Sequence, residues 1–386
     1  PYSVCTAFHD ADGNIRFRST EHSWQNGRCR YCGASREVYD RDDTLESHAY
    51  EFIHTENPET IFPDMKFDVI IGNPPYQLSD GGAQASAIPI YHKFIQQAQK
   101  LKPRFLCMIV PSRWFSGGRG LDEFRNEMLS DSRIRVIHDF PNALECFPGV
   151  EIKGGVCFFL WDRDNSGLCE ITTHLGDSLS IMKRPLLERG CDSFIRYNES
   201  ISILRKVQQI DGNSSNFSSL ISAQKPFGLR TYEQGESSYV EGYLKLYANK
   251  NTGFISREKI VDPNHLIGKH KIYISAAYNA GDTYPHQIIN KPFYGEPDSC
   301  CTETYLAIGP FASEQEADNA ISYMRCRLFR FLVLLLKISQ HAAQKVYSLV
   351  PIQDFSQSWT DEKLYAKYGI TNEEIKFIES MVKIMK

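Results

Sequence analysis

The chain has 386 residues and a formal net charge of −4 at pH 7. Its hydrophobic content of 42% and charged content of 23% are ordinary for a globular protein, and no apolar run approaches the roughly 18 residues that a membrane span requires. The first residues lack the pattern of a secretory signal, and eleven cysteines, an odd number, argue against a disulfide framework. We therefore expect a cytoplasmic protein of two or three domains without a membrane partner.

Residues 1–60 form a polar insertion that contains a metal-type motif. The stretch HSWQNGRCRYCGA brings His22 close to the pair Cys29 and Cys32, which have Cys-x-x-Cys spacing. This pattern resembles a zinc knuckle, whose tetrahedral site needs four nitrogen or sulfur ligands. The sequence offers three residues for the fourth ligand, which are Cys5, His9 and His48. Two interpretations stay open, a structural zinc site and thiols that bind no metal.

Residues 61–165 alternate apolar runs with amphipathic stretches. The apolar runs are typical of strands that are buried on both faces. Strands are predicted at 67–72, 104–110, 134–140 and 154–161, and helices at 89–101 and 121–129. This alternation predicts an α/β fold with a parallel sheet. The last strand follows its predecessor without room for a crossover helix, so we expect the two to pair antiparallel.

The rest of the chain separates into two further segments. Residues 166–223 are rich in Ser, Asn and Asp around one predicted helix, and we interpret them as a connector. Residues 224–386 mix aromatic-rich strands with a helix that begins at Ser313, where Glu316 would complete a capping box, and end in a helical tail. The exposed side of that helix is expected to be basic, through Arg325, Arg327, Arg330, Lys337 and Lys345.

The predicted strand at 67–72 ends in Asn73, Pro74, Pro75 and Tyr76. At the carboxyl edge of a parallel sheet, this turn would lie where such folds bind ligands. Two prolines fix φ and remove two N–H donors, which leaves a stiff turn rich in acceptors. The Asn73 side-chain oxygen and the Pro74 carbonyl could hold both hydrogens of an amino group, while Tyr76 stacks on a planar base. The turn therefore predicts a clamp that presents an amine.

This strand, turn and helix resemble those of the adenine-N6 DNA methyltransferases that use S-adenosylmethionine, in particular the large restriction-modification methylases. The similarity extends over PIYHKFIQQAQKL, RFLCMIVPSRWF, CFPGVEIKGGVCFFLW, QKPFGLRT and QHAAQKVYSLVPIQDF. It implies a class I methyltransferase (Rossmann-like) domain at 61–165 and a mixed α/β target-recognition domain at 224–386. It also implies that double-stranded DNA is the partner.

The resemblance implies site-specific methylation of adenine in a restriction-modification system, with the base flipped out of the duplex. Residues 73–76 would be catalytic, and Tyr76 and Phe147 would stack on the base, unless Phe147 is only a core residue. The basic side of the 313–345 region would contact phosphates, unless it is simply a solvated surface. Two alternatives stay open: a methyltransferase acting on protein glutamine amides, and a DNA-binding specificity module without activity of its own.

The glycine-rich cofactor loop of the family is not found before Lys66. The one glycine-rich turn, SGGRGLDEF at 116–124, follows the Asn-Pro-Pro-Tyr turn and lacks a leading acidic strand end, so we interpret it as the start of a helix. We therefore expect an N-terminally incomplete methyltransferase that is inactive alone. Its partners would be the missing N-terminal region or a restriction subunit.

A calorimetric titration of the chain with S-adenosylmethionine tests this expectation. We predict weak binding or none, because no loop is identified that would hold the methionine part of the cofactor. Binding with a micromolar Kd would contradict it.

Overall fold

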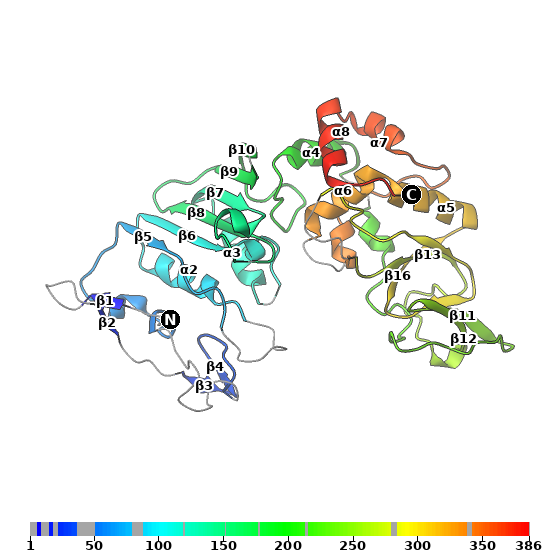
Figure 1. Cartoon of the computed structure of the whole chain (residues 1–386), viewed down its shortest axis with the longest axis horizontal. Helices are drawn as coiled ribbons and strands as arrows, with labels where there is room; N and C mark the ends of the chain where they lie inside the picture. Colours follow the sequence, from blue (N-terminus) through cyan, green and yellow to red (C-terminus); the bar gives the residue numbers. More distant parts are fainter. Residues whose placement is uncertain are drawn as a thin grey trace. The chain divides into compact units, whose positions relative to one another are not determined.

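The computed structural model describes residues 6–8, 15–17, 22–36, 51–78, 88–118, 120–150, 152–176, 178–212, 215–278, 284–337 and 342–385. The chain divides into two compact units, which are residues 1–198 and 199–386 (Figure 1). Within the described ranges, no helix has the length and apolar character needed to cross a membrane.

The first unit contains short N-terminal strands and one larger sheet. Its strands are β1 (Thr6–Phe8), β2 (Ile15–Phe17), β3 (Trp24–Gln25), β4 (Arg28–Cys29), β5 (Val69–Gly72), β6 (Phe105–Pro111), β7 (Ile134–Phe140), β8 (Val156–Asp162), β9 (Cys169–Leu175) and β10 (Ser178–Arg184). Its helices are α2 (Tyr91–Lys100) and α3 (Asp122–Ser130), with the 3-10 turns η1 (Glu51–Ile53), η2 (Pro58–Ile61), η3 (Ser112–Phe115) and η4 (Ala143–Glu145).

Six strands form the large sheet in the order β10-β9-β7-β8-β6-β5. The pairs β5–β6 and β7–β9 are parallel, whereas β8 lies between β6 and β7 and is antiparallel to both. The structure thus confirms the predicted α/β class and the antiparallel pairing of the fourth predicted strand. Each of those four strands begins and ends within two residues of its predicted bounds.

The core of the first unit lies between this sheet and helices α2 and α3. Alternate residues of β6, such as Leu106 and Val110, are fully buried in one cluster with apolar residues of the two helices, including Ile95 and Phe124. Period-two alternation in the strand and a buried stripe on each helix produce this contact. The helices therefore hold β5 and β6 in place from one side.

A buried ion pair lies at the end of β7. Asp139 is fully buried, and its carboxylate accepts hydrogen bonds from the Arg196 guanidinium and from the Ser112 hydroxyl. Arg196 also donates to the Gly154 carbonyl over 2.7 Å. The ion pair therefore connects three segments, which are the turn after β6, the residues just before β8 and the segment after β10.

The second unit contains strands β11 (Tyr243–Ala248), β12 (Asn251–Ser256), β13 (His270–Ser275), β14 (Phe293–Gly295), β15 (Ser299–Cys301) and β16 (Tyr305–Phe311). Its helices are α4 (Glu199–Asp211), α5 (Glu314–Arg325), α6 (Arg327–Leu336), α7 (Asp361–Tyr368) and α8 (Asn372–Met381), with the 3-10 turns η5 (Phe217–Leu220), η6 (Arg257–Lys259) and η7 (Gln344–Tyr347). The strands form two three-stranded sheets, β12-β11-β15 and β14-β13-β16. One apolar cluster contains residues of both sheets, among them Leu246 from β11 and Tyr273 from β13.

The structure divides residues 166–223 differently from the predicted connector. Strands β9 and β10 extend the sheet of the first unit, and α4 opens the second unit, so the division falls after Asn198. Buried positions such as Ile171 explain why this segment is not a linker, since its apolar residues complete the core despite the polar composition.

The Asp139 ion pair generates a prediction about stability. Arg196→Met should destabilise the first unit by about 3–5 kcal/mol, because removal of one partner leaves the other charge buried and uncompensated. Urea unfolding measures this as a lower midpoint. Arg163→Met is the matched control, because Arg163 pairs with Asp164 at the exposed surface and its loss should hardly change the midpoint. Equal midpoints for Arg196→Met and the unmodified protein would contradict the assignment.

Candidate functional site

The Asn-Pro-Pro-Tyr turn begins where β5 ends. β5 pairs parallel with β6 from Val69 opposite Phe105 to Gly72 opposite Met108, so Asn73 leaves the sheet at its carboxyl edge. Asn73 is exposed, whereas Pro74 is buried and anchors the turn. The Asn73 amide is therefore displayed at the surface and not packed into the core.

Tyr76 is half-buried beside the main core cluster. Burial raises the pKa of its hydroxyl to about 12, and that hydroxyl has no hydrogen-bond partner among the described residues. The backbone around it is well fixed, because the Tyr76 carbonyl accepts from the Ile90 N–H at 3.1 Å and the Leu78 N–H donates to the Ile88 carbonyl at 3.0 Å. These bonds connect the turn directly to the start of α2.

The segment between β7 and β8 approaches the same place. Burial raises the pKa of Tyr76 most, and Cys157 and then Cys146 raise it further. Phe147 follows Cys146 directly, is half-buried, and donates its N–H to the Ala143 carbonyl at 2.8 Å. Among the described residues, no ring contact joins Phe147 to Tyr76. Its role in stacking therefore stays a prediction.

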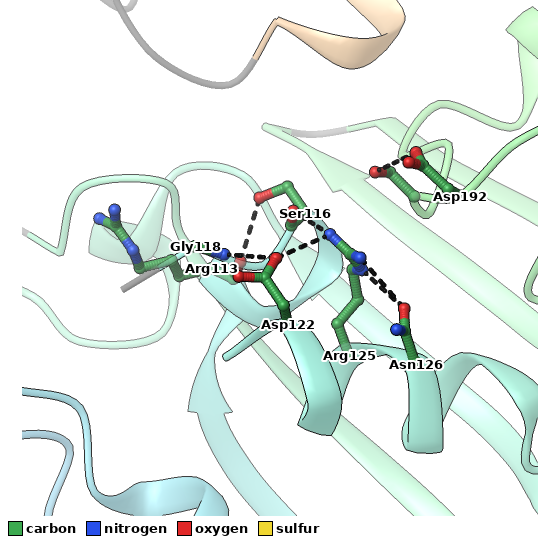
Figure 2. A network of polar contacts seen from close by, with 8 residues as sticks. Arg113, Ser116, Gly118, Asp122, Arg125, Asn126 and Asp192 are labelled. Atoms are coloured by element: carbon green, nitrogen blue, oxygen red, sulfur yellow. Dashed lines mark hydrogen bonds and ion pairs between the residues drawn. The ribbon is translucent and has the colours of Figure 1, made fainter. Parts of the chain in front are cut away.

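The glycine-rich turn before α3 is filled by side chains of its own helix. The Gly118 N–H donates to the Asp122 carboxylate at 3.1 Å, and the Arg125 guanidinium donates to that carboxylate and to the Ser116 carbonyl (Figure 2). A Cβ on Gly117 would lie 2.5 Å from the Asp122 carboxylate, which explains the glycine there. The turn does not fit the carboxylate of a methionine group, and the interpretation as a helix start agrees with the structure.

The basic region of the second unit is not one helix face. α5 ends at Arg325, Cys326 is extended with ψ of 144°, and a separate helix α6 follows. Ser313 caps α5 as predicted by accepting from the Glu316 N–H, but the Glu316 carboxylate accepts from the Ala312 N–H instead of completing the box at Ser313.

The prediction that Arg330 contacts DNA is wrong. Arg330 is fully buried, and its guanidinium donates to four backbone carbonyls, those of Gln287, Arg325, Cys326 and Lys383. Burial lowers its pKa to about 10. The break at Cys326 explains the error. The exposed side is predicted by continuing the helical spacing of α5 past residue 325, but α6 is a separate helix and its residues are buried on all sides.

The other four basic residues differ in exposure. Arg327 pairs with Glu379, and Lys337 is half-buried and donates to the Tyr278 carbonyl at 3.4 Å. Lys345 is exposed and Arg325 is partly exposed. Lys345 is thus the most exposed of the predicted phosphate contacts, and Arg325, Arg327 and Lys337 are partly buried.

The zinc-type motif brings four donors together. The donor atoms of His22, Cys29, Cys32 and His54 all lie within 4.8 Å of one another. Among the described residues His54 provides a fourth donor. The three candidates suggested by the sequence, Cys5, His9 and His48, lie outside the described residues. Burial and the nearby His54 lower the pKa of His22 to about 4, and burial raises the pKa of Cys32 to about 12.

Sequence reasoning missed two groups of residues. His54 is 22 residues from Cys32 in a stretch without metal-type spacing, so only the folded chain brings it to the cysteines. The second group is the network formed by Asp139, Arg196 and Ser112. A signal for it exists in the sequence, which is the single Asp inside the apolar run IRVIHDF. An acidic residue in a buried strand needs a partner.

Comparison with known proteins matches the region that carries the turn. Residues 2–147 match the Eco57I restriction-modification methylase family. An uncharacterized adenine-specific methylase of Mycoplasma pneumoniae is 36% identical over 180 residues, which cover 43% of this chain and 43% of that protein. The alignment thus spans less than half of the curated relative. Neither match favours a methyltransferase of glutamine amides.

Two solved structures are also similar. The type IIG restriction endonuclease BpuSI is 12% identical with a TM-score of 0.33, and the match covers 79% of this chain and 49% of that one. The Type IIL restriction-modification enzyme MmeI in complex with DNA is 11% identical with a TM-score of 0.38, covering 81% and 56%. TM-scores this low do not establish a common fold. The family match and the curated relative nevertheless confirm the resemblance to adenine-specific methylases of restriction-modification systems.

Proposed function

We propose that this chain takes part in site-specific methylation of adenine N6 in DNA, as part of a restriction-modification system, and that residues 73–76 orient the amine. The observation that carries the proposal is the exposed Asn73 at the carboxyl end of β5, followed by two prolines and a tyrosine. The family match over residues 2–147 supports it. The cytoplasm, where bacterial DNA lies, would be the compartment.

The proposed role of the turn follows from the chemistry of an exocyclic amine. The lone pair of adenine N6 is delocalised into the ring, so the nitrogen is a weak nucleophile. Two acceptors, the Asn73 Oδ1 and the Pro74 carbonyl oxygen, would take both N–H hydrogens and turn the lone pair outward. The prolines keep these acceptors in place, because they restrict φ and bring no competing N–H donor.

The base would reach the turn only after it leaves the duplex. The Tyr76 ring, and the Phe147 ring that follows Cys146, would hold the flipped adenine by stacking, which is worth about 1–3 kcal/mol per base. S-adenosylmethionine supplies an electrophilic methyl carbon in this family. The glycine-rich turn before α3 does not fit that cofactor, because the Asp122 carboxylate and the Arg125 guanidinium fill it.

We place double-stranded DNA against the second unit through its accessible basic residues. Arg325 and Lys345 are the residues that we propose as phosphate contacts, with lesser contributions from Arg327 and Lys337. Such contacts position a duplex without reading its sequence. Sequence recognition would come from other side chains of this unit.

The clamp is tested in cells that produce the natural protein. Asn73→Ala should reduce N6-methyladenine at the target site by at least about 100-fold, comparable to the loss of one oriented hydrogen-bond acceptor or donor in other active sites. Long-read sequencing that detects methylated adenine provides the measurement. Asn165→Ala is the matched control, because Asn165 lies at the end of the strands opposite to Asn73. It follows β8, whose last residue, Asp162, pairs with Phe105 at the start of β6.

The control should methylate normally. Gel shift with the same proteins separates the two steps, since Asn73→Ala should bind target DNA almost as well as the unmodified protein. Methylation by Asn73→Ala at the level of the control would refute the clamp.

The phosphate contacts are tested by the salt dependence of DNA binding. Arg325→Ala together with Lys345→Ala should reduce the slope of log K against log salt by about 1.8, because each lost phosphate contact removes about 0.9. Lys376→Ala, an exposed lysine of α8 near Glu373 and Glu379, is the control and should leave the slope unchanged. An unaltered slope in the double variant would place the duplex on another surface.

A further inference from the structure

The four donors described above have the geometry of a metal site. The His22 Nδ1 lies 3.3 Å from the His54 Nε2 and 3.4 Å from the Cys32 Sγ. In a tetrahedral zinc site with Zn–N of about 2.0–2.1 Å and Zn–S of about 2.3 Å, two nitrogens lie about 3.3 Å apart, and a nitrogen and a sulfur about 3.5 Å apart. The two measured edges therefore match the edges of such a tetrahedron.

The surroundings of the donors fit a closed site. Cys29 is 3% exposed and Cys32 is 1% exposed, and the two histidines are half-buried. The Cys29 N–H donates to the Ala34 carbonyl at 2.8 Å, and the Gly33 N–H donates to the Cys29 carbonyl at 2.9 Å, so the Cys-x-x-Cys turn has a fixed backbone. Two cysteine sulfurs and two imidazole nitrogens are a ligand set typical of structural zinc.

Helix α2 fixes the position of the fourth donor, His54. The Gln97 side chain in α2 donates to the carbonyls of Phe52 and Thr55, both at 2.8 Å, and these residues flank His54. η1 is thereby attached to α2. His54 follows η1 directly, so the attachment to α2, which also packs on the sheet, holds His54 beside the two cysteines.

The structure assigns to His22, Cys29, Cys32 and His54 a structural Zn²⁺ site that fastens residues 22–36 onto η1 and, through η1, onto α2. All four positions of the tetrahedron belong to the protein, so no position is left for a substrate or a reactive water. Strands β3 and β4 have two residues each, and a hairpin of this size is not stable in water without additional support. The metal supplies that support.

The site is connected to the Asn-Pro-Pro-Tyr turn through one apolar cluster. Cys29 and Cys32 pack in the same cluster as Leu78, which is two residues beyond Tyr76, and as Ile90 at the start of α2. Bound zinc would therefore hold the packing partner of the segment that follows the turn. Its loss should loosen residues 22–36 first and the turn second.

Metal analysis of the natural protein, purified without a histidine tag, tests the site. We expect one zinc per chain. His54→Asn should weaken zinc binding at least about tenfold in competition with a chromophoric chelator, because the loss of even an outer-shell partner costs that much. His265→Asn, an exposed histidine of the second unit with a φ of 53° that asparagine also adopts, is the matched control and should bind zinc normally.

Cobalt substitution of the unmodified protein gives a readout that does not depend on how a variant folds. Bound Co²⁺ should show the strong visible bands of a tetrahedral site together with thiolate charge transfer. Absence of stoichiometric zinc, or the weak spectrum of octahedral Co²⁺, would overturn the site. Zinc loss in a Cys5, His9 or His48 variant, with none in His54→Asn, would overturn this set of ligands.

Discussion

The parallel pairing of β5 with β6 is the constraint on which the proposed chemistry depends. This pairing directs both strands toward the same edge of the sheet, so the turn after β5 and the loop after β6 emerge side by side. If β5 slipped by one residue against β6, Ile70 would move from the core to the other face of the sheet. This slip is unfavourable, because Ile70 would lose its contact with the core cluster that contains the buried Leu106 and Met108. The hydrophobic pattern thus fixes where Asn73 leaves the sheet.

Two further interactions secure that edge. Asp139, fully buried at the end of β7, holds the loop after β6 through the Ser112 hydroxyl and the segment after β10 through Arg196. On the other side, residues around η1 pack with Leu78 and Ile90, which border the turn. The exposed Asn73 amide thus lies in a rigid frame. Such rigidity suits the orientation of a weak nucleophile, because a small displacement of a reacting group lowers the reaction rate strongly.

Much of the first unit could be predicted because its strands are long, apolar and separated by amphipathic helices. The four strands β5 to β8 and both helices were anticipated within two residues at almost every end, and the turn was identified from its position after a strand. Prediction failed where non-local contacts decide. Composition suggested a connector at 166–223, yet Ile171 packs in the core, and the extended Cys326 divides a pattern that looked like one helix.

The candidate sites show the same limit. Residue types and spacing single out Asn73 to Tyr76 and the Cys-x-x-Cys pair as candidates, because each group is contiguous in the chain. The roles of both groups stay predictions. His54 could not be chosen, since η1 brings it to the cysteines only in the folded protein. Arg330 is predicted at the surface because the sequence pattern indicates one continuous helix with a basic side. The chain instead breaks at Cys326, and four backbone carbonyls accept from the buried Arg330 guanidinium.

The most direct test of the amine clamp is a structure of the natural protein bound to its target duplex. The account predicts a flipped adenine whose N6 lies within about 2.7–3.2 Å of both the Asn73 Oδ1 and the Pro74 carbonyl oxygen, with Tyr76 against the ring. A flipped adenine held elsewhere, with Asn73 facing solvent, would contradict it.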